Sequence, residues 1–146
     1  MKMTVFVFAC LQTMLLSVNT LGDKPISFEQ LPAQSQQLIK DYFSGESIAL
    51  IKMDTDILDT SYEVIFTDGN KIEFDRKGNW KEIDCKRSQC PEKLIPVQIR
   101  NHAKQNFPNA KILKIEKEDR NGYDIDLSNG INLEFDSNYQ LIDIED

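Results

Sequence analysis

The feature that most constrains the fold of this chain is an internal repeat. SYEVIFTDGNKIEFD (residues 61–75) aligns with GYDIDLSNGINLEFD (122–136) at an offset of 61 positions, and Leu31-Pro32 aligns with Ile95-Pro96 at an offset of 64. The three-residue difference falls in the loop MDTDILDTS, after the first expected strand. Because the identities lie in expected strands and the gap lies in a loop, the pattern indicates a duplicated structural unit.

Each copy predicts one helix followed by four short strands. The helical patterns run from Leu31 to Phe43 and from Ile95 to Phe107, each with a proline in the first turn, where its missing N–H has no partner. The strands are expected at residues 47–53, 61–67, 70–76 and 79–85, and at 110–117, 122–128, 130–136 and 139–145. Asp68-Gly69 and Asn129-Gly130 predict two-residue hairpin turns in which both residues have positive φ. The expected fold class is α+β, a tandem repeat of one helix plus a four-stranded antiparallel meander, with the helices on one sheet face.

The first 22 residues have the pattern of a secretory signal peptide. Lys2 precedes an apolar stretch, residues 4–18, and small residues predict cleavage before Asp23. The apolar stretch is shorter than the ~20 residues that a membrane span needs. A lipoprotein attached through Cys10 ranks lower, because too few apolar residues precede this cysteine. We therefore expect a secreted protein with no stable membrane span.

Removal of the signal peptide leaves 124 of the 146 residues, enough for one compact domain or two very small ones. We expect two repeats, residues 23–86 and 87–146, which could also form one joint domain. The signal peptide has one lysine and no acidic residue, so its removal takes the net charge from −7 to −8. Such a charge argues against nucleic acid and anionic membrane surfaces as partners and favours a partner with a basic surface.

Two of the three cysteines, Cys85 and Cys90, remain in the mature chain. Their spacing, CKRSQC, differs from the Cys-x-x-Cys of redox motifs. Two cysteines and one histidine do not supply the four ligands of a structural zinc site. In an oxidising compartment an even number of cysteines predicts a disulfide. This bridge would close a short loop between the repeats and contribute about 2 kcal/mol.

Alternation along the strands separates two faces of the sheet. Residues such as Tyr62, Val64 and Phe66 are expected to face the helices, and the opposite positions carry ten carboxylates and one lysine. The candidate partner-binding residues on that opposite face are Glu63, Ile65, Glu73, Trp80, Glu82, Asp124, Asp126, Glu134 and Leu141. Two interpretations stay open. The face is either an ordinary solvated surface or a binding surface on which Trp80 anchors a partner and the carboxylates attract its basic groups.

Other patterns give weaker functional signals. Asp54, Asp56 and Asp59 resemble a calcium loop, but the glycine and the glutamate that an EF-hand needs are not in place. The single histidine, His102, is expected on the solvent side of the second helix. The sequence contains no phosphate-binding loop, nucleophile elbow or other recognisable catalytic constellation. We therefore expect no enzyme activity, no cofactor and no dedicated metal site.

Several motifs of this chain together resemble one known family. They are the paired Leu-Pro and Ile-Pro helix starts, the Tyr-x-(Val/Ile)-x-(Phe/Leu)-x-(Asp/Asn)-Gly strands with their following Glu-Phe-Asp, WKEIDCK (80–86) and NFPNAKILKIEK (106–117). That family is the putative beta-lactamase-inhibitor-like, PepSY-like family of secreted bacterial proteins, and the resemblance covers about residues 28–146. It implies a Gram-negative periplasmic or outer-surface location and a concave, largely antiparallel sheet. The family has no agreed catalytic residues, so the resemblance implies none here.

These observations predict a non-catalytic binding module, an inhibitor or regulator of another envelope protein that acts through the exposed acidic sheet face. The alternative is a PepSY-type sensor that binds a divalent cation or a cationic peptide on the same face. A third interpretation, from another class, is a hydrolytic enzyme with an unrecognised site.

Overall fold

The structure, a computed structural model, describes residues 22–146. The predicted signal peptide and Cys10 lie outside the described residues, apart from Gly22. In chain order the elements are β1 (Lys24–Pro25), the 3-10 helix η1 (Phe28–Gln30), α1 (Ala33–Tyr42), β2 (Ile48–Thr55), β3 (Thr60–Phe66), β4 (Lys71–Asp75), β5 (Trp80–Asp84), the 3-10 helix η2 (Glu92–Leu94), α2 (Val97–Asn106), β6 (Ile112–Lys117), β7 (Tyr123–Leu127), β8 (Asn132–Phe135) and β9 (Leu141–Glu145).

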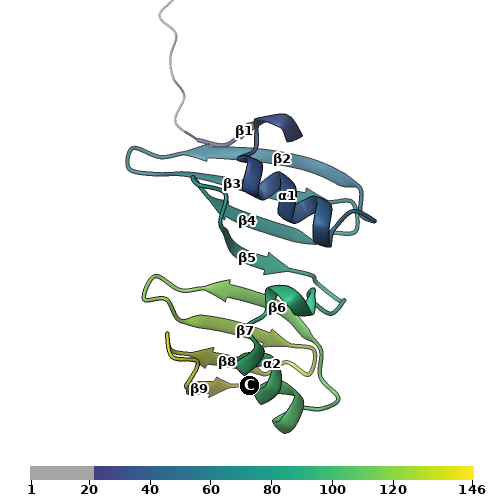
Figure 1. Ribbon diagram of the computed structural model, residues 1–146, viewed down its shortest axis with the longest axis vertical. Helices are drawn as coiled ribbons and strands as arrows, with labels where there is room; N and C mark the ends of the chain where they lie inside the picture. Colours follow the sequence, from purple (N-terminus) through teal and green to yellow (C-terminus); the bar gives the residue numbers. More distant parts are fainter. Residues whose placement is uncertain (1–21) are drawn as a thin grey trace, which may run out of the picture.

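The strands form a single antiparallel sheet in the spatial order β1 to β9, so every strand neighbours the next one along the chain (Figure 1). The predicted α+β class with an antiparallel sheet is confirmed. β5 pairs with β6 and sets Ile83 opposite Ile115, so the two predicted meanders join edge to edge. The short first strand, β1, was not predicted; it pairs with β2 at the N-terminal edge.

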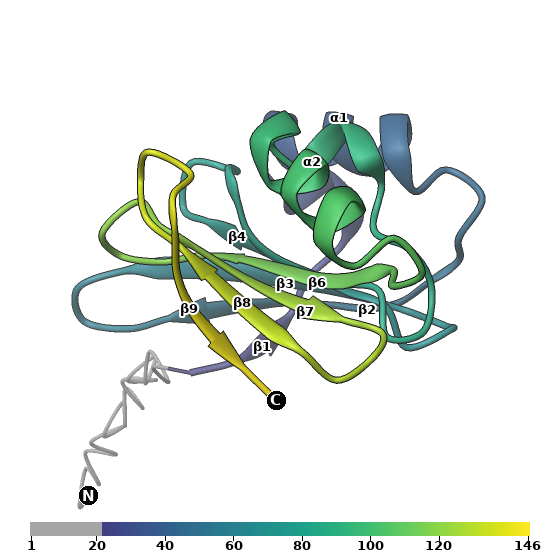
Figure 2. The ribbon, with the colours of Figure 1, turned by 90° about the horizontal axis from the view of Figure 1, so that it is seen from below.

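Both helices lie on the same face of the sheet (Figure 2). Pro32 and Pro96 occupy the N-cap positions, directly before the first helical residue. Each helix buries one apolar stripe against the sheet, through Ile39 in α1 and through Ile99 in α2. The opposite face of the sheet, here called the helix-free face, has no helix of residues 22–146 over it (Figure 2).

Alternate residues of the central strands build the core. Val64, Ile72, Ile125 and Leu133 are fully buried beneath the helices, as the alternation predicts. Phe43 at the end of α1 stacks on a strand phenylalanine, Phe66, with 5.3 Å between ring centroids.

The prediction of a solvent-side His102 is wrong. This side chain is half-buried, and its ring packs edge-on against Phe135 with 5.3 Å between centroids. His102 lies one position before the buried Ala103, so its side chain is directed partly toward the sheet.

The hairpin turns differ from the two-residue turns predicted. Phe66 N–H donates to Asn70 O at 2.9 Å, and Gly69 N–H donates to Phe66 O at 3.0 Å, so the loop has three residues. Only Gly69 has positive φ, at 92°, because a type I turn followed by one left-handed residue closes the hairpin. The β7–β8 hairpin has the same arrangement, with Gly130 at φ 88°.

Candidate partner-binding face

One line of acidic side chains crosses the helix-free face. Each of the strands β3 to β9 contributes one carboxylate, and each of these residues lies directly opposite the next across the sheet. This carboxylate row consists of Glu63, Glu73, Glu82, Glu116, Asp124, Glu134 and Asp143. Lys52 on β2 lies opposite Glu63 at the start of the row. Glu116 is not among the residues predicted for this face, although the alternation in ILKIEK indicates its side.

Lysines compensate the half of the row that lies on β3 to β6. Lys71 Nζ lies 3.5, 3.0 and 3.1 Å from carboxylate oxygens of Glu63, Glu73 and Glu82. Lys114 Nζ lies 3.4 Å from Glu82 and 3.0 Å from Glu116. Partial burial alone would lower the pKa of Lys71, but its hydrogen bonds to Glu73 and Glu82 raise that pKa above its usual value. The expectation of a single lysine on this face is therefore corrected, since Lys52 and Lys114 join Lys71.

The half on β7 to β9 lacks this compensation. Asn132 occupies the position that corresponds to Lys71 at the offset of 61, and its amide donates to Asp124 and, at 2.8 Å, to Asp126. Among the described residues, no lysine or arginine forms an ion pair with any carboxylate of this half. We call the carboxylates of β7 to β9 on this face the acidic half. It comprises Asp124, Glu134 and Asp143 of the row, with Asp126 and Glu145 beside them.

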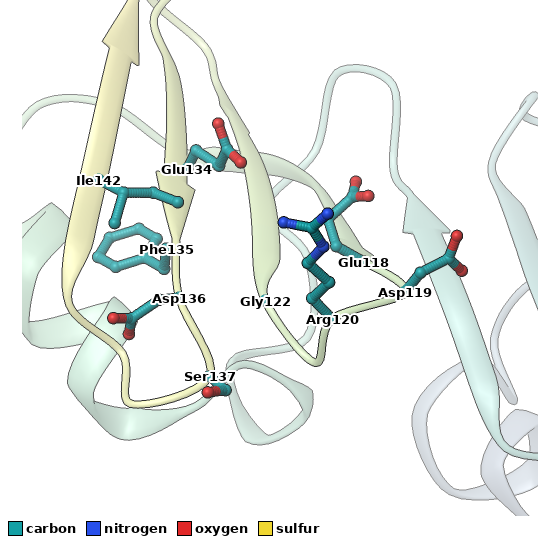
Figure 3. A pocket seen from close by; sticks show the side chains of 9 residues that line it. All are labelled: Glu118, Asp119, Arg120, Gly122, Glu134, Phe135, Asp136, Ser137 and Ile142. Atoms are coloured by element: carbon teal, nitrogen blue, oxygen red, sulfur yellow. The ribbon is translucent and has the colours of Figure 1, made fainter.

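A shallow cavity of about 450 Å³ adjoins the acidic half (Figure 3). Its lining, which we call the acidic pocket, comprises Glu118, Asp119, Arg120, Gly122, Glu134, Phe135, Asp136, Ser137 and Ile142. Burial, together with the negative charges of Glu116 and Asp124, raises the pKa of Glu118. A Cβ at Gly122 would lie 2.6 Å from the carbonyl oxygen of Phe135, so only glycine fits this close approach of two strands. Sequence reasoning missed this pocket because it depends on the β6–β7 and β8–β9 turns lying side by side.

The structure corrects the positions of Trp80 and Leu141. Bulges between β4 and β5 and between β8 and β9 set Trp80 opposite Phe74 and Leu141 opposite Phe135. Each bulge inserts one residue and reverses the alternation, so both side chains lie on the helix side and pack against the core. Lys117 Nζ lies 3.7 Å from the centroid of the Trp80 ring.

The other predicted site residues keep their expected face. Glu63, Glu73 and Glu82 lie in the compensated half, and Glu82 is only 8% exposed. Ile65 lies opposite Lys71 on the same face. The remaining predicted residues, Asp124, Asp126 and Glu134, belong to the acidic half.

The cysteines and the calcium-like loop have no arrangement that indicates chemistry. Cys85 and Cys90 are buried free thiols. A hydrogen bond to Cys85, together with burial, raises the pKa of the Cys90 thiol, so Cys90 is not poised as a nucleophile. The disulfide stays a prediction. In the loop before β3, the carboxylates of Asp56 and Asp59 accept hydrogen bonds from the backbone N–H of the next residue. Within residues 22–146 no group of three or more acidic, cysteine or histidine side chains is placed to hold a metal ion.

The fold and this face define a small α+β protein with a charged, solvent-facing sheet surface. A family model described as "Putative beta-lactamase-inhibitor-like, PepSY-like" matches residues 60–143. The chain belongs to this PepSY-like family, and the resemblance seen in the sequence is confirmed. A comparison with curated proteins gave no match.

Three solved structures are similar over most of the chain. A putative calcium-regulated periplasmic protein from Bacteroides thetaiotaomicron is 50% identical, with a TM-score of 0.82 over 85% of this chain and 97% of that chain. A protein from Bacteroides vulgatus described as a putative periplasmic protein is 46% identical, with the same TM-score and coverage. A second Bacteroides vulgatus protein, described as a putative periplasmic protein of unknown function, is 36% identical, with a TM-score of 0.79 over 86% of this chain and all of that chain.

The predicted periplasmic localisation is confirmed by these relatives. In the part of the chain from Gly22 onward, no helix is long and apolar enough to cross a membrane. Taken together, the comparisons agree with a non-catalytic periplasmic module.

Proposed function

We propose that this protein is a non-catalytic binding module that holds a basic region of another envelope protein on its helix-free face and thereby inhibits or regulates that protein. The observation that carries the proposal is the unequal compensation of the carboxylate row. One half has its own lysines, and the acidic half has Asn132 in their place.

Electrostatic repulsion explains why this asymmetry favours a partner. Adjacent strands lie about 4.8 Å apart, and two like charges about 5 Å apart repel by roughly 0.8 kcal/mol at the dielectric constant of water. Like charges directly opposite each other across strands are destabilising. Lys71 and Lys114 offset this repulsion on β3 to β6. The amide of Asn132 donates hydrogen bonds to two carboxylates but brings no positive charge to β7 to β9, where a basic partner would supply it.

We also infer that residues 23–86 and 87–146 are copies of one unit that form a joint domain and have taken different roles. The first copy carries its own counter-charges and acts as scaffold. The second copy, with Asn132 where the first has Lys71, supplies the binding surface. The β5–β6 pairing supports a joint domain because it continues one sheet across the boundary.

Affinity capture tests the proposed function. Mature protein, residues 23–146, is immobilised and exposed to envelope extract of its own source at low and at high salt. The Asn132→Lys variant gives the acidic half the counter-charge of the first copy. Gln105→Lys adds the same charge at an exposed position of α2, on the helix side, and serves as the matched control.

Wild type and the Gln105→Lys variant are expected to retain one basic partner at low salt, and the Asn132→Lys variant is expected to retain much less of it. Equal retention by all three proteins would contradict a role for the helix-free face.

A divalent-cation sensor is the second candidate, favoured by the Bacteroides thetaiotaomicron relative that is described as calcium-regulated. Calcium would bind the acidic half after a small rearrangement of its side chains, since carboxylate oxygens are its preferred ligands. This candidate predicts a calcium-dependent rise in melting temperature that EDTA reverses and that Glu134→Gln reduces. The absence of any calcium response would exclude it.

A further inference from the structure

The C-terminal edge of the sheet is the five-residue strand β9 with an open outer side, whereas the N-terminal edge is only the two-residue strand β1. At the N-terminal edge, β1 pairs with β2, and Ile26 N–H donates to Ile51 O at 3.0 Å. At the other edge, β9 pairs with β8 alone among the described residues. An open edge offers unpaired backbone N–H and C=O groups to an incoming strand.

The backbone of Ile144 faces this open edge. Its N–H donates to Oδ1 of the neighbouring Asp143 at 2.9 Å and so points away from β8. Backbone directions alternate along an antiparallel strand, so the C=O of Ile144 points outward with its N–H. A strand added here would exchange hydrogen bonds with Ile144 and release the Asp143 carboxylate for a new partner.

The side chains of β9 indicate which residues an added strand would need in order to pair with it. Ile144 lies opposite the buried Leu133, on the helix side, and is 50% exposed. Asp143 and Glu145 lie on the helix-free face, opposite Glu134 and Asn132, where they extend the acidic half to the edge. An apolar residue is therefore favoured opposite Ile144, and lysine or arginine is favoured on either side of it.

We propose that β9 binds an extended segment of the partner as a tenth strand, in which apolar residues alternate with lysine or arginine. This proposal rests on the proposed function and names the partner's chemistry. The acidic pocket lies beside the start of β9, with Ile142 and Glu134 in its lining, and receives one further basic side chain of the same segment (Figure 3). The stem of that side chain contacts Ile142, at the end of the pocket nearest to β9.

Charge complementarity excludes a second copy of this chain as the favoured occupant. Two β9 strands in antiparallel pairing would set acidic residues against acidic residues around Asp143, and like charges directly opposite each other are destabilising. A basic strand reverses the sign of every one of these contacts.

The test uses a capped Lys-Val-Lys-Val-Lys-Val-Lys peptide and measures its Kd for mature protein by calorimetry. Valine opposite Ile144 would direct its own N–H toward β9, and the lysine N–H groups would point away from it. N-methylation of the valines removes the donors that face β9, whereas N-methylation of the lysines leaves them intact. Each modified peptide carries three backbone N-methyl groups, on the three valines or on three of the four lysines, so the two peptides have the same charge and the same number of methyl groups.

We expect valine N-methylation to weaken binding by about tenfold or more, because lost hydrogen bonds of about 1 kcal/mol each accumulate, and lysine N-methylation to leave it nearly unchanged. The Ile144→Pro variant, which removes the outward donor at a position where an edge strand tolerates proline, should weaken the unmodified peptide similarly. Its melting temperature reports whether the fold is kept. Wild-type hydrogen exchange at Ile144 should slow when the peptide binds.

Other outcomes separate this inference from the proposed function. If all three peptides bind equally and Asn132→Lys weakens them, the helix-free face binds basic partners but strand addition is refuted. If no peptide binds at low salt, both proposals are refuted. If sedimentation shows a wild-type dimer that Ile144→Pro dissociates, the occupant of the edge is a second copy, and the basic strand is refuted.

Discussion

Lys71→Asn is the perturbation that best measures how far lysines stabilise the carboxylate row. Asparagine is the residue at the aligned position 132, in β8. The variant removes three ion pairs at 3.0 to 3.5 Å. It leaves Glu82, whose side chain is 11% exposed, with Lys114 at 3.4 Å as its remaining counter-charge.

The expected loss is about 2 kcal/mol of unfolding free energy. Exposed ion pairs contribute roughly 0.2–1 kcal/mol each, and removing one partner of a buried carboxylate costs more than that. For a domain of this size, a loss of about 2 kcal/mol lowers the melting temperature by roughly 8 °C.

The pH dependence of this effect follows from the raised pKa of Lys71. A raised pKa means that the lysine's contribution is fully present below its unfolded value of 10.5 and is lost as the pH rises through the folded value. The difference between wild type and Lys71→Asn should therefore stay constant from pH 6 to 9 and shrink only above about 10.5.

Thermal unfolding followed by circular dichroism measures both effects. Lys77→Asn is the matched control, because Lys77 is exposed in the β4–β5 turn and the structure gives it no ion pair within residues 22–146. If Lys71→Asn lowered the melting temperature no more than Lys77→Asn does, the compensation argument would fail.

Three further predictions concern other parts of the molecule. Lys117→Met removes the cation over Trp80 and should cost about 0.5–1 kcal/mol, with a change in the tryptophan fluorescence of the folded protein; an unchanged spectrum would contradict that contact. Gly122→Ala should destabilise by roughly 1–3 kcal/mol in urea unfolding, since its Cβ would meet the Phe135 carbonyl; stability equal to wild type would refute the close approach. Protein exported to the periplasm should show no free thiol after denaturation, as the predicted disulfide requires, and reduction or Cys90→Ala should then lower stability by about 2 kcal/mol; two titratable thiols would overturn that prediction.

The helices and the sheet follow from local patterns in the sequence. Successive side chains of a strand point to opposite faces of the sheet. The alternation of apolar and polar residues therefore predicted that Val64 and Ile125 lie on the buried face. The proline starts and apolar stripes located both helices within one or two residues.

The position of Trp80 could not be predicted in this way. A bulge inserts one residue into a strand and changes the face of every side chain beyond it. The spacing of residues in β4 and β5 does not indicate where the bulge lies. The same error affected Leu141. Carboxylates such as Glu134 and Asp124 were assigned correctly because no bulge separates them from the buried residues that fix the register.

The pairing of acids with lysines also depends on tertiary structure. Lys114 meets Glu82 only because β5 and β6, from different copies, become neighbours in one sheet. The sequence contains both residues but does not indicate that β5 and β6 pair. The difference in lysine partners between the two halves of the row appears only once this pairing is known.

The measurement that tests the central claim most directly is the Kd of a capped penta-lysine peptide, determined at low salt for wild type, Asn132→Lys and Gln105→Lys. If the acidic half binds basic partners, Asn132→Lys should weaken binding by about fivefold, equivalent to roughly 1 kcal/mol, and Gln105→Lys should match wild type. Equal weakening by both variants would show that only net charge matters and would contradict a binding site on the helix-free face.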